Sequence, residues 1–348
     1  MKKAYIIRLL ILAFITVAVL FNYSNRNVNA AVISPDKYYI DITPGETKNF
    51  ELKVLGDARQ PDTLQLYAYP MTMEKIGEED ERDFQIPNLN DEAEPANWIK
   101  LNIDKFTLSA GQIVSIPFSV SVSEIARCGT NLATIFISTA PREELNKNLN
   151  SNAQDSQVGI RNSIVSQLHI NVNSTNQEYC DEVKTKLDLI EFKVDSFLPI
   201  YNYDNIKFIT RIKNEGNLLS QSPKGYIELF GSGSKITIPF NDEELDIYPG
   251  TTRKFTNSWI DPDYPVNGNF IEQFVYELSH FRFGQYEARL GVTFNVSPKI
   301  VSSIYVWIIP WKVVLVAAII IALLIFIYIR DRRKTKELRE LKKAPKRN

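Results

Sequence analysis

The sequence predicts an all-β protein with two tandem β-sandwich domains followed by a single transmembrane α-helix. Apolar and polar residues alternate in Asn49–Leu55 and Gln112–Ser121, which places the apolar side chains on one face of a strand. Turn pairs such as Pro44-Gly45 and Pro249-Gly250 recur at short spacing, as is typical of sandwiches. Near the C-terminus, Val313–Ile329 contains no charged residue and is rich in Ile, Leu, Val and Ala. Such a run is typical of a membrane helix.

Residues 1–30 predict a secretory signal peptide. The start is basic, with Lys2, Lys3 and Arg8, and the apolar stretch Leu9–Phe21 follows it. Val28-Asn29-Ala30 precedes Ala31 and fits the small-residue rule for signal cleavage. The alternative is an anchor that is not cleaved.

The segment between the signal and the C-terminal run is long enough for two domains. We expect the first over residues 32–175, a polar linker over 176–186, and the second over 187–298. The stretch Asp41–Phe50 resembles Asp246–Phe255, and both patterns predict a strand, a Pro-Gly turn and a second strand. This weak repeat favours two related units, although a common turn can produce the same similarity by chance.

A transmembrane helix is expected over residues 304–329. The apolar run covers about 25 Å of a hydrocarbon layer of roughly 30 Å, and Ile304–Trp311 can supply the missing turn. Trp307 and Trp311 suit the outer membrane interface, where amphipathic rings gather. We expect Lys312 at the same boundary, with its stem in lipid and its amine among the headgroups.

Charges predict which side of the membrane each end occupies. Arg330, Arg332 and Arg333 follow the apolar run and mark a cytoplasmic flank. The basic tail 330–348 has 10 basic and 3 acidic residues, whereas residues 31–329 have 26 basic and 38 acidic residues. We therefore predict a single-pass protein of the cell membrane with a cytoplasmic C-terminus and an extracellular body. An acidic body argues against nucleic acid as a partner.

The two cysteines, Cys128 and Cys180, are expected on the exported side, where disulfides persist. Cys128 precedes a predicted strand over Thr130–Ser138, and Cys180 follows one over Ile164–Val172. If these strands form an antiparallel hairpin, the cysteines can meet. Two free thiols are the alternative.

Nothing in the sequence favours catalysis, a cofactor or a metal. His169 alternates with apolar neighbours and is expected to point outward from its strand, and His280 has no metal-binding partner at useful spacing. Gly-x-Ser-x-Gly, His-Glu-x-x-His and P-loop motifs are missing. Asp261-Pro262-Asp263 could offer oxygen atoms to calcium, but a solvated turn is the favoured interpretation.

Binding is the favoured role, and two kinds of surface are candidates. The loops Glu74–Glu94 and Pro141–Gln157 are long and irregular, and such loops are often functional. Tyrosines on the predicted strands of the first domain could form a face for sugar or peptide, because their rings bring area at low entropic cost. Ordinary packing within the sheet is the favoured alternative. These tyrosines are Tyr38, Tyr39, Tyr67 and Tyr69.

The order of segments resembles a known family. Tyr38–Gly45 forms a strand with a Pro-Gly turn, Asn97-Trp98-Ile99-Lys100-Leu101 follows, and then Gly129–Ser138. With the signal, a second β domain, one membrane helix and a basic tail, this order is similar to the WxL-interacting surface proteins of Gram-positive bacteria. The resemblance implies immunoglobulin-like domains, the first contacting peptidoglycan and the second meeting a partner or host surface. It assigns no binding residue.

The sequence thus predicts a membrane-anchored surface protein of bacteria for binding, adhesion or scaffolding. Its partners would be the membrane and either peptidoglycan or another surface protein. Two alternatives stay open: an exported enzyme that acts on the cell wall, and a non-catalytic accessory subunit of a membrane complex.

Overall fold

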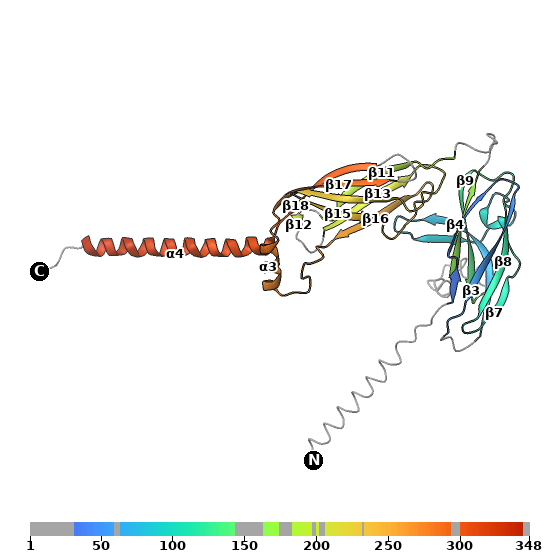
Figure 1. Cartoon of the computed structure of the whole chain (residues 1–348), viewed down its shortest axis with the longest axis horizontal. Coiled ribbons are helices and arrows are strands. Elements are labelled where there is room, and N and C mark those ends of the chain that lie inside the picture. The colour runs from blue at the N-terminus through green and yellow to red at the C-terminus, as the bar shows by residue number, and fades with distance from the viewer. Residues whose placement is uncertain are drawn as a thin grey trace, which may run out of the picture. The chain divides into compact units, whose positions relative to one another are not determined.

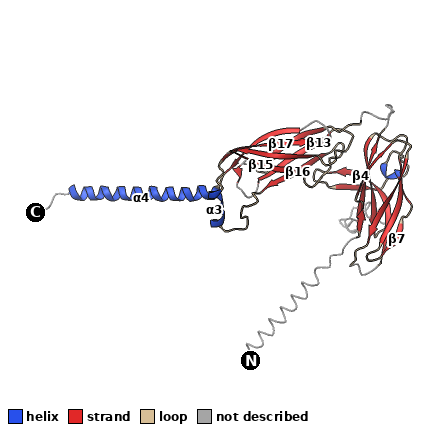
Figure 2. Ribbon diagram, in the orientation of Figure 1, coloured by secondary structure: helices blue, strands red, loops and turns tan. Residues whose placement is uncertain are grey.

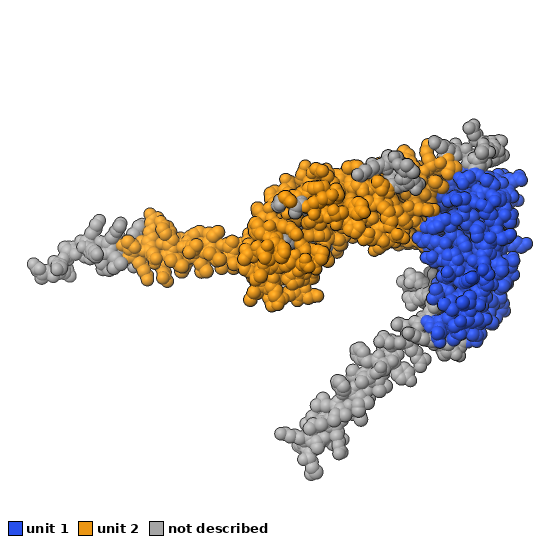
Figure 3. All heavy atoms as spheres, viewed as in Figure 1, with its two compact units in different colours: residues 1–75, 83–182 blue, residues 76–82, 183–348 orange. Residues whose placement is uncertain are grey.

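The chain forms two compact units. Residues 1–75 and 83–182 make up the first, and residues 76–82 and 183–348 the second (Figure 3). The predicted signal peptide, most of the linker and Cys180 lie outside the described residues. In this computed structural model, the described residues are 31–58, 63–142, 163–173, 183–196, 200–201, 206–231, 233–293 and 300–343.

The first unit is built from two sheets. One has the strand order β1-β3-β8-β6, and the other has the order β2-β10-β9-β4-β5, with β7 paired to β4. Strand β2 runs parallel to β10, whereas β10 and β9 are antiparallel. Its elements are β1 (Val32–Ser34), β2 (Lys37–Ile42), β3 (Thr47–Leu55), β4 (Leu64–Ile76), β5 (Arg82–Gln85), a 3-10 turn η1 (Pro95–Trp98), β6 (Ile99–Leu101), β7 (Lys105–Leu108), β8 (Ile113–Ser121), β9 (Gly129–Ser138) and β10 (Ile164–Val172) (Figure 1).

The core of the first unit lies between these sheets. Leu52 and Phe118 come from one sheet, Ile135 and Leu168 come from the other, and all four belong to one buried apolar cluster. The predicted alternation in β8 is confirmed, because Ile116, Phe118 and Val120 are all buried. Burial of these side chains supplies the main driving force for this unit.

The second unit also contains two sheets, of orders β11-β13-β16 and β12-β18-β17-β14-β15. Gly225 of β14 lies opposite Phe240 of β15, so these two strands form an antiparallel hairpin. Its elements are β11 (Leu187–Val194), β12 (Ile200–Tyr201), β13 (Ile206–Asn214), β14 (Lys224–Gly231), β15 (Ser234–Phe240), β16 (Thr252–Trp259), helix α3 (Phe270–Ser279), β17 (Gly284–Thr293), β18 (Ile300–Ile308) and helix α4 (Trp311–Lys343) (Figure 2). The predicted architecture, mostly β with one apolar C-terminal helix, is confirmed.

The predicted start of the membrane helix at residue 304 is wrong. Ile304 to Ile308 belongs to strand β18, and α4 begins only at Trp311. Val306 and Ile308 are fully buried and Ile304 packs against the same core, so alternate side chains serve the second unit. The last strand of this unit therefore extends beyond the predicted domain end at residue 298.

Two further expectations are corrected. His169 does not point outward, because β10 is a central strand flanked by β2 and β9, and the histidine is fully buried with the ring of Tyr39 at 4.8 Å. Helix α3 was not expected, since no helical period is evident outside the terminal segments. Asn269 caps its first turn, and Glu272 returns a hydrogen bond to the Asn269 backbone, completing a capping box.

Candidate functional site

Helices α3 and α4 meet at one end of the second unit, next to the last residues of β18. Only Ile309 and Pro310 separate β18 from α4. In the part of the chain that the structure describes, one helix is long and apolar enough to cross a membrane, and it spans Trp311–Thr335. At 1.5 Å per residue this stretch reaches about 38 Å, more than the hydrocarbon layer requires.

A buried ion pair joins the two helices. The Nζ of Lys312 donates to Oε1 of Glu277 at 3.1 Å and to the hydroxyl of Tyr264 at 3.0 Å. The backbone N–H of Lys312 donates to Oε2 of the same carboxylate at 3.0 Å. Glu277 is 0% exposed and Lys312 is 4% exposed. The expectation that the Lys312 amine lies among headgroups is therefore wrong, because Glu277 draws it into the protein.

A second ion pair lies beside the first. Asp261 accepts hydrogen bonds from Arg282 and, at 2.8 Å, from the hydroxyl of Tyr276. Burial raises the pKa of Asp261, but the bonds from Arg282 and Tyr276 outweigh it and hold the pKa below its ordinary value. Burial and the Asp261 carboxylate raise the pKa of Tyr276, which keeps its hydroxyl protonated as a donor.

These contacts bear on the suggested calcium site. The side-chain oxygens of Asp261 already accept hydrogen bonds from Arg282 and Tyr276. The first carboxylate of the Asp261-Pro262-Asp263 turn therefore stabilises the protein itself. Among the described residues, no group of three His, Cys, Asp or Glu side chains is placed to hold a metal ion.

The predicted membrane-interface residues fall on different elements. Trp307 lies on β18 and Trp311 is the first residue of α4, and both are exposed. The amine of Lys312 lies 4.3 Å from the ring centre of Trp311, a cation–π contact. Arg330, Arg332 and Arg333 continue α4 past the apolar stretch and are exposed.

The first unit has a hollow of about 420 Å³ along β4. Tyr67 and Tyr69 reach it from the same face of the strand, and the amine of Lys105 lies 5.5 Å from the Tyr67 ring centre. Asp104 and Arg142 add charges of both signs. Aromatic groups next to charges of both signs suit a polar ligand such as a sugar or an extended peptide.

The other two tyrosines have different roles. Tyr38 packs its ring at 5.4 Å from that of Phe118 and donates to the carbonyl of Glu51 at 2.6 Å. Burial, with the nearby Glu51 charge, raises the pKa of Tyr38 to about 12. Tyr39 lies on β2 with its ring against His169. The four tyrosines therefore do not form one face, and only Tyr67 and Tyr69 share a site.

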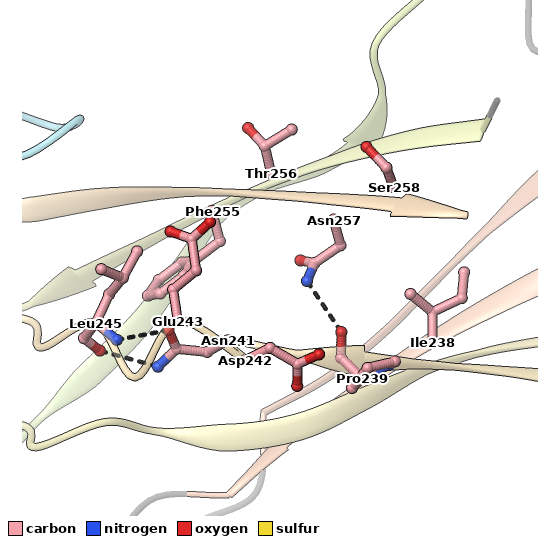
Figure 4. A pocket seen from close by; sticks show the side chains of 10 residues that line it. All are labelled: Ile238, Pro239, Asn241, Asp242, Glu243, Leu245, Phe255, Thr256, Asn257 and Ser258. Atoms are coloured by element: carbon pink, nitrogen blue, oxygen red, sulfur yellow. Dashed lines mark hydrogen bonds between the residues drawn. The ribbon is translucent and has the colours of Figure 1, made fainter. Parts of the chain in front are cut away.

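The second unit has a smaller hollow of about 190 Å³ between β15 and β16 (Figure 4). Asn257 donates to the carbonyl of Pro239 at 3.0 Å, and Asn241 holds the loop after β15 through Leu245. Asp242 and Glu243 line the same hollow. Asn241 and the amide nitrogen of Asn257 are used in these bonds to the backbone, whereas Oδ1 of Asn257 is buried without a hydrogen-bond partner among the described residues.

Acidic residues of the predicted contact loop Glu74–Glu94 are partly neutralised within the second unit. Burial raises the pKa of Asp80, but hydrogen bonds from Arg253 and Arg82 outweigh it, so the pKa lies below its ordinary value. Less free charge is therefore left for an outside partner. The pairs are Asp80 with Arg82 at 2.6 Å and with Arg253 at 2.9 Å, Glu78 with Arg211 at 2.7 Å, and Glu79 with Lys254 at 2.5 Å. The other predicted loop, Pro141–Gln157, lies mostly outside the described residues.

Cys128 is disulfide-bonded. The antiparallel pairing of β9 with β10 is confirmed and places Gly129, the residue after Cys128, opposite Val172. Cys180 lies outside the described residues, so its pairing with Cys128 stays a prediction.

Sequence reasoning did not find Tyr264 and Glu277. Their signal is weak, since a single glutamate near the end of a short helix has many uses. The capping box Asn269 to Glu272 was the local clue to the helix that carries Glu277.

In the comparisons with known proteins, the chain matches solved structures but no family model and no curated protein. Among solved structures, the chain is similar to one in a chaperone–tip adhesin complex of CFA/I fimbriae, with 13% identity, a TM-score of 0.36, and 79% of this chain and 98% of that chain covered. It is also similar to the class 5 fimbriae chaperone CfaA, with 14% identity, a TM-score of 0.34, and coverage of 78% and 98%. The E. coli chaperone DraB matches at 11% identity and a TM-score of 0.30, with coverage of 79% and 95%. At these scores, nothing about the role of this chain follows from the likeness.

Proposed function

We propose that this chain is a membrane-anchored binding protein without catalytic activity. Helix α4 would cross the cell membrane once, with the basic tail on the cytoplasmic side and the β units outside. There the units would contact the cell wall or another surface protein, as the resemblance to WxL-interacting proteins implies.

The observation that carries the proposal is the junction between the second unit and α4. A two-residue connection and the buried Lys312–Glu277 pair fasten the helix to the unit. A fixed junction suits a protein that presents this unit to other molecules at the membrane, because a preorganised surface loses less freedom on binding.

The most suitable contact site is the hollow along β4 in the first unit. Tyr67 offers an aromatic face, and Asp104, Lys105 and Arg142 offer charged groups. Wall polymers and extended peptides both present apolar faces next to polar and charged groups. The same hollow therefore fits either of the two partners proposed.

The buried carboxylates at the base of the second unit do not support the wall-active enzyme. A general acid for glycoside hydrolysis must hold a proton near neutral pH. Asp261 is bound to Arg282, and its pKa lies below the ordinary value, which does not suit a group that must hold a proton. Glu277 is engaged by the amine of Lys312. These groups suit a structural joint.

The proposal is tested by capture with the full chain in lipid nanodiscs, using isolated cell walls in one arm and a surface-protein extract in the other. We expect retention in one arm, and loss of retention in the Tyr67→Ala/Lys105→Ala variant. Tyr226→Ala is the matched control, because Tyr226 is an exposed tyrosine of the second unit that lies outside the hollow. Equal retention of both variants would remove the hollow from the proposal, and no retention in either arm would contradict the binding role.

A further inference from the structure

Helix α3 turns its apolar side away from the protein. Ile271, Val275 and Leu278 are spaced by four and three residues and form one stripe along the helix. Their exposed fractions are 71%, 54% and 55%. In a soluble protein this stripe would face the core. Here the residue that faces inward is Glu277, the partner of Lys312.

The apolar surface continues beyond the helix. Phe281 stacks near Phe283, with ring centres 6.3 Å apart, and Phe283 lies 6.4 Å from Trp307. At the other end, the ring of Phe270 lies 6.2 Å from that of Trp311. All five of these rings are exposed. Monomeric soluble proteins rarely expose an apolar patch of this extent unless something covers it.

The patch adjoins the point where the membrane helix begins. Trp311 is the first residue of α4, and the exposed apolar stretch follows from Val314 onward. Figure 2 shows α3 running across the start of α4. A helix that crosses a spanning helix at its outer end lies along the membrane surface.

The two ion pairs of the junction are held within the protein in this placement. The Lys312 amine and the Glu277 carboxylate satisfy each other inside the protein, and Arg282 is paired with Asp261. The N-terminal carboxylate Glu272 is bound to the backbone of Asn269, off the apolar stripe. Lipid is therefore the occupant that fits best, because aromatic rings gather at the interface and amphipathic helices lie within it.

We propose that α3, together with Phe281 and Phe283, lies in the interfacial layer of the outer leaflet, with Ile271, Val275 and Leu278 inserted among the lipids. The inference rests on the proposed membrane anchoring by α4. It adds a second attachment, which restricts the tilt of α4 together with the unit fastened to it. Two attachments would hold this unit against the bilayer at one angle.

The test uses the full chain in lipid vesicles with an environment-sensitive fluorophore on single introduced cysteines. Val275→Cys reports on the stripe, and Leu323→Cys reports on the middle of the apolar span Trp311–Thr335. Thr293→Cys is the control, because Thr293 lies at the other end of β17, about 30 Å from Gly284. Labelling without reductant, with the unsubstituted chain as blank, corrects for native thiols. Nitroxide-labelled lipids then quench fluorophores that contact the bilayer.

We expect loss of emission at Val275 with nitroxide near the headgroup, loss at Leu323 with nitroxide deep in the acyl chain, and no change at Thr293. Quenching at Leu323 without quenching at Val275 would overturn the inference and leave the anchoring intact. Absence of quenching at both would overturn the anchoring as well. Ile271→Cys repeats the measurement on the same stripe, and circular dichroism checks that each variant is folded.

Discussion

Lys312 and Glu277 form a buried ion pair that ties the first turn of α4 to helix α3. The amine and carboxylate are 3.1 Å apart, and the Tyr264 hydroxyl accepts a further bond from the amine at 3.0 Å. Taking both charges out of water is costly, and their attraction offsets that cost only while both are present. The pair therefore fixes the geometry of the junction more than it adds to stability.

Replacing one partner should be strongly destabilising. Glu277→Gln keeps hydrogen-bonding atoms but leaves the Lys312 charge buried without a counter-charge, so we expect a loss of about 3–5 kcal/mol in the free energy of unfolding. Denaturant unfolding in detergent micelles measures it. The double variant Glu277→Gln/Lys312→Met removes both charges and should recover much of the loss. Lys312→Met alone completes the comparison. If the loss of unfolding free energy in the double variant equals the sum of the losses in Glu277→Gln and Lys312→Met, the two residues are not coupled.

Stability should fall in acid, and Asp261 should account for part of the decrease. Its pKa is held below the ordinary value of about 3.9 in the folded state, so the unfolded chain binds a proton more readily. The contribution of Asp261 is complete above the unfolded pKa and is lost as the pH falls through the lower, folded pKa. Thermal unfolding from pH 7 down to pH 3 checks this.

In that series, Asp261→Asn should have a shallower acid decrease than the unsubstituted chain. Asp263→Asn is the matched control, since Asp263 lies in the same turn and its backbone N–H donates to Asp261, whereas the ion pair of Arg282 is with Asp261. Identical acid profiles for the unsubstituted chain and Asp261→Asn would refute the assignment.

Trp98 should matter for folding of the first unit. It is buried in the core, and its indole N–H donates to the carbonyl of Glu92 at 2.8 Å. Trp98→Ala should cost about 3–5 kcal/mol, because it leaves a large cavity. Trp98→Phe keeps a ring in place and loses the hydrogen bond, so a smaller cost is expected. Urea unfolding measures the loss of stability in each variant. Equal losses for Trp98→Ala and Trp98→Phe would indicate that the packing of the ring is not what Trp98 contributes.

The disulfide of Cys128 should involve Cys180. Thiol titration of the unreduced chain should find no free thiol, and Cys180→Ser should expose one. In the chain-entropy model, closing a loop of this length stabilises by about 4 kcal/mol, so the variant should unfold at lower denaturant concentration. Two reactive thiols in the unreduced chain would contradict the pairing.

Alternation of apolar residues was sufficient to predict the sandwich strands. In β8, every second side chain from Ile116 to Val120 is buried, because one face of the strand meets the core. The same rule failed for His169, since β10 is buried on both faces and its polar positions are also covered. Sequence period shows which residues share a face, but burial of the other face depends on tertiary neighbours.

The junction could be predicted only in part. The segment Ile304–Ile308 is apolar, so its sequence alone fits the outer turn of a membrane helix as well as it fits a strand. Strand pairing of Ile304 with Ala288 decides between them. The apolar stripe of α3 is short and faces outward, so its pattern does not predict a helix packed on the core. Glu277 and Lys312 are 35 residues apart in the sequence, and no local rule joins them.

The orientation of the chain is tested most directly by labelling single cysteines on intact cells with a membrane-impermeant thiol reagent. Thr293→Cys, on the exposed end of β17, should react with intact cells. Arg333→Cys, beyond the apolar stretch of α4, should react only after the cells are permeabilised. The reverse pattern, or reaction of both positions on intact cells, would contradict a membrane anchor that holds the β units outside.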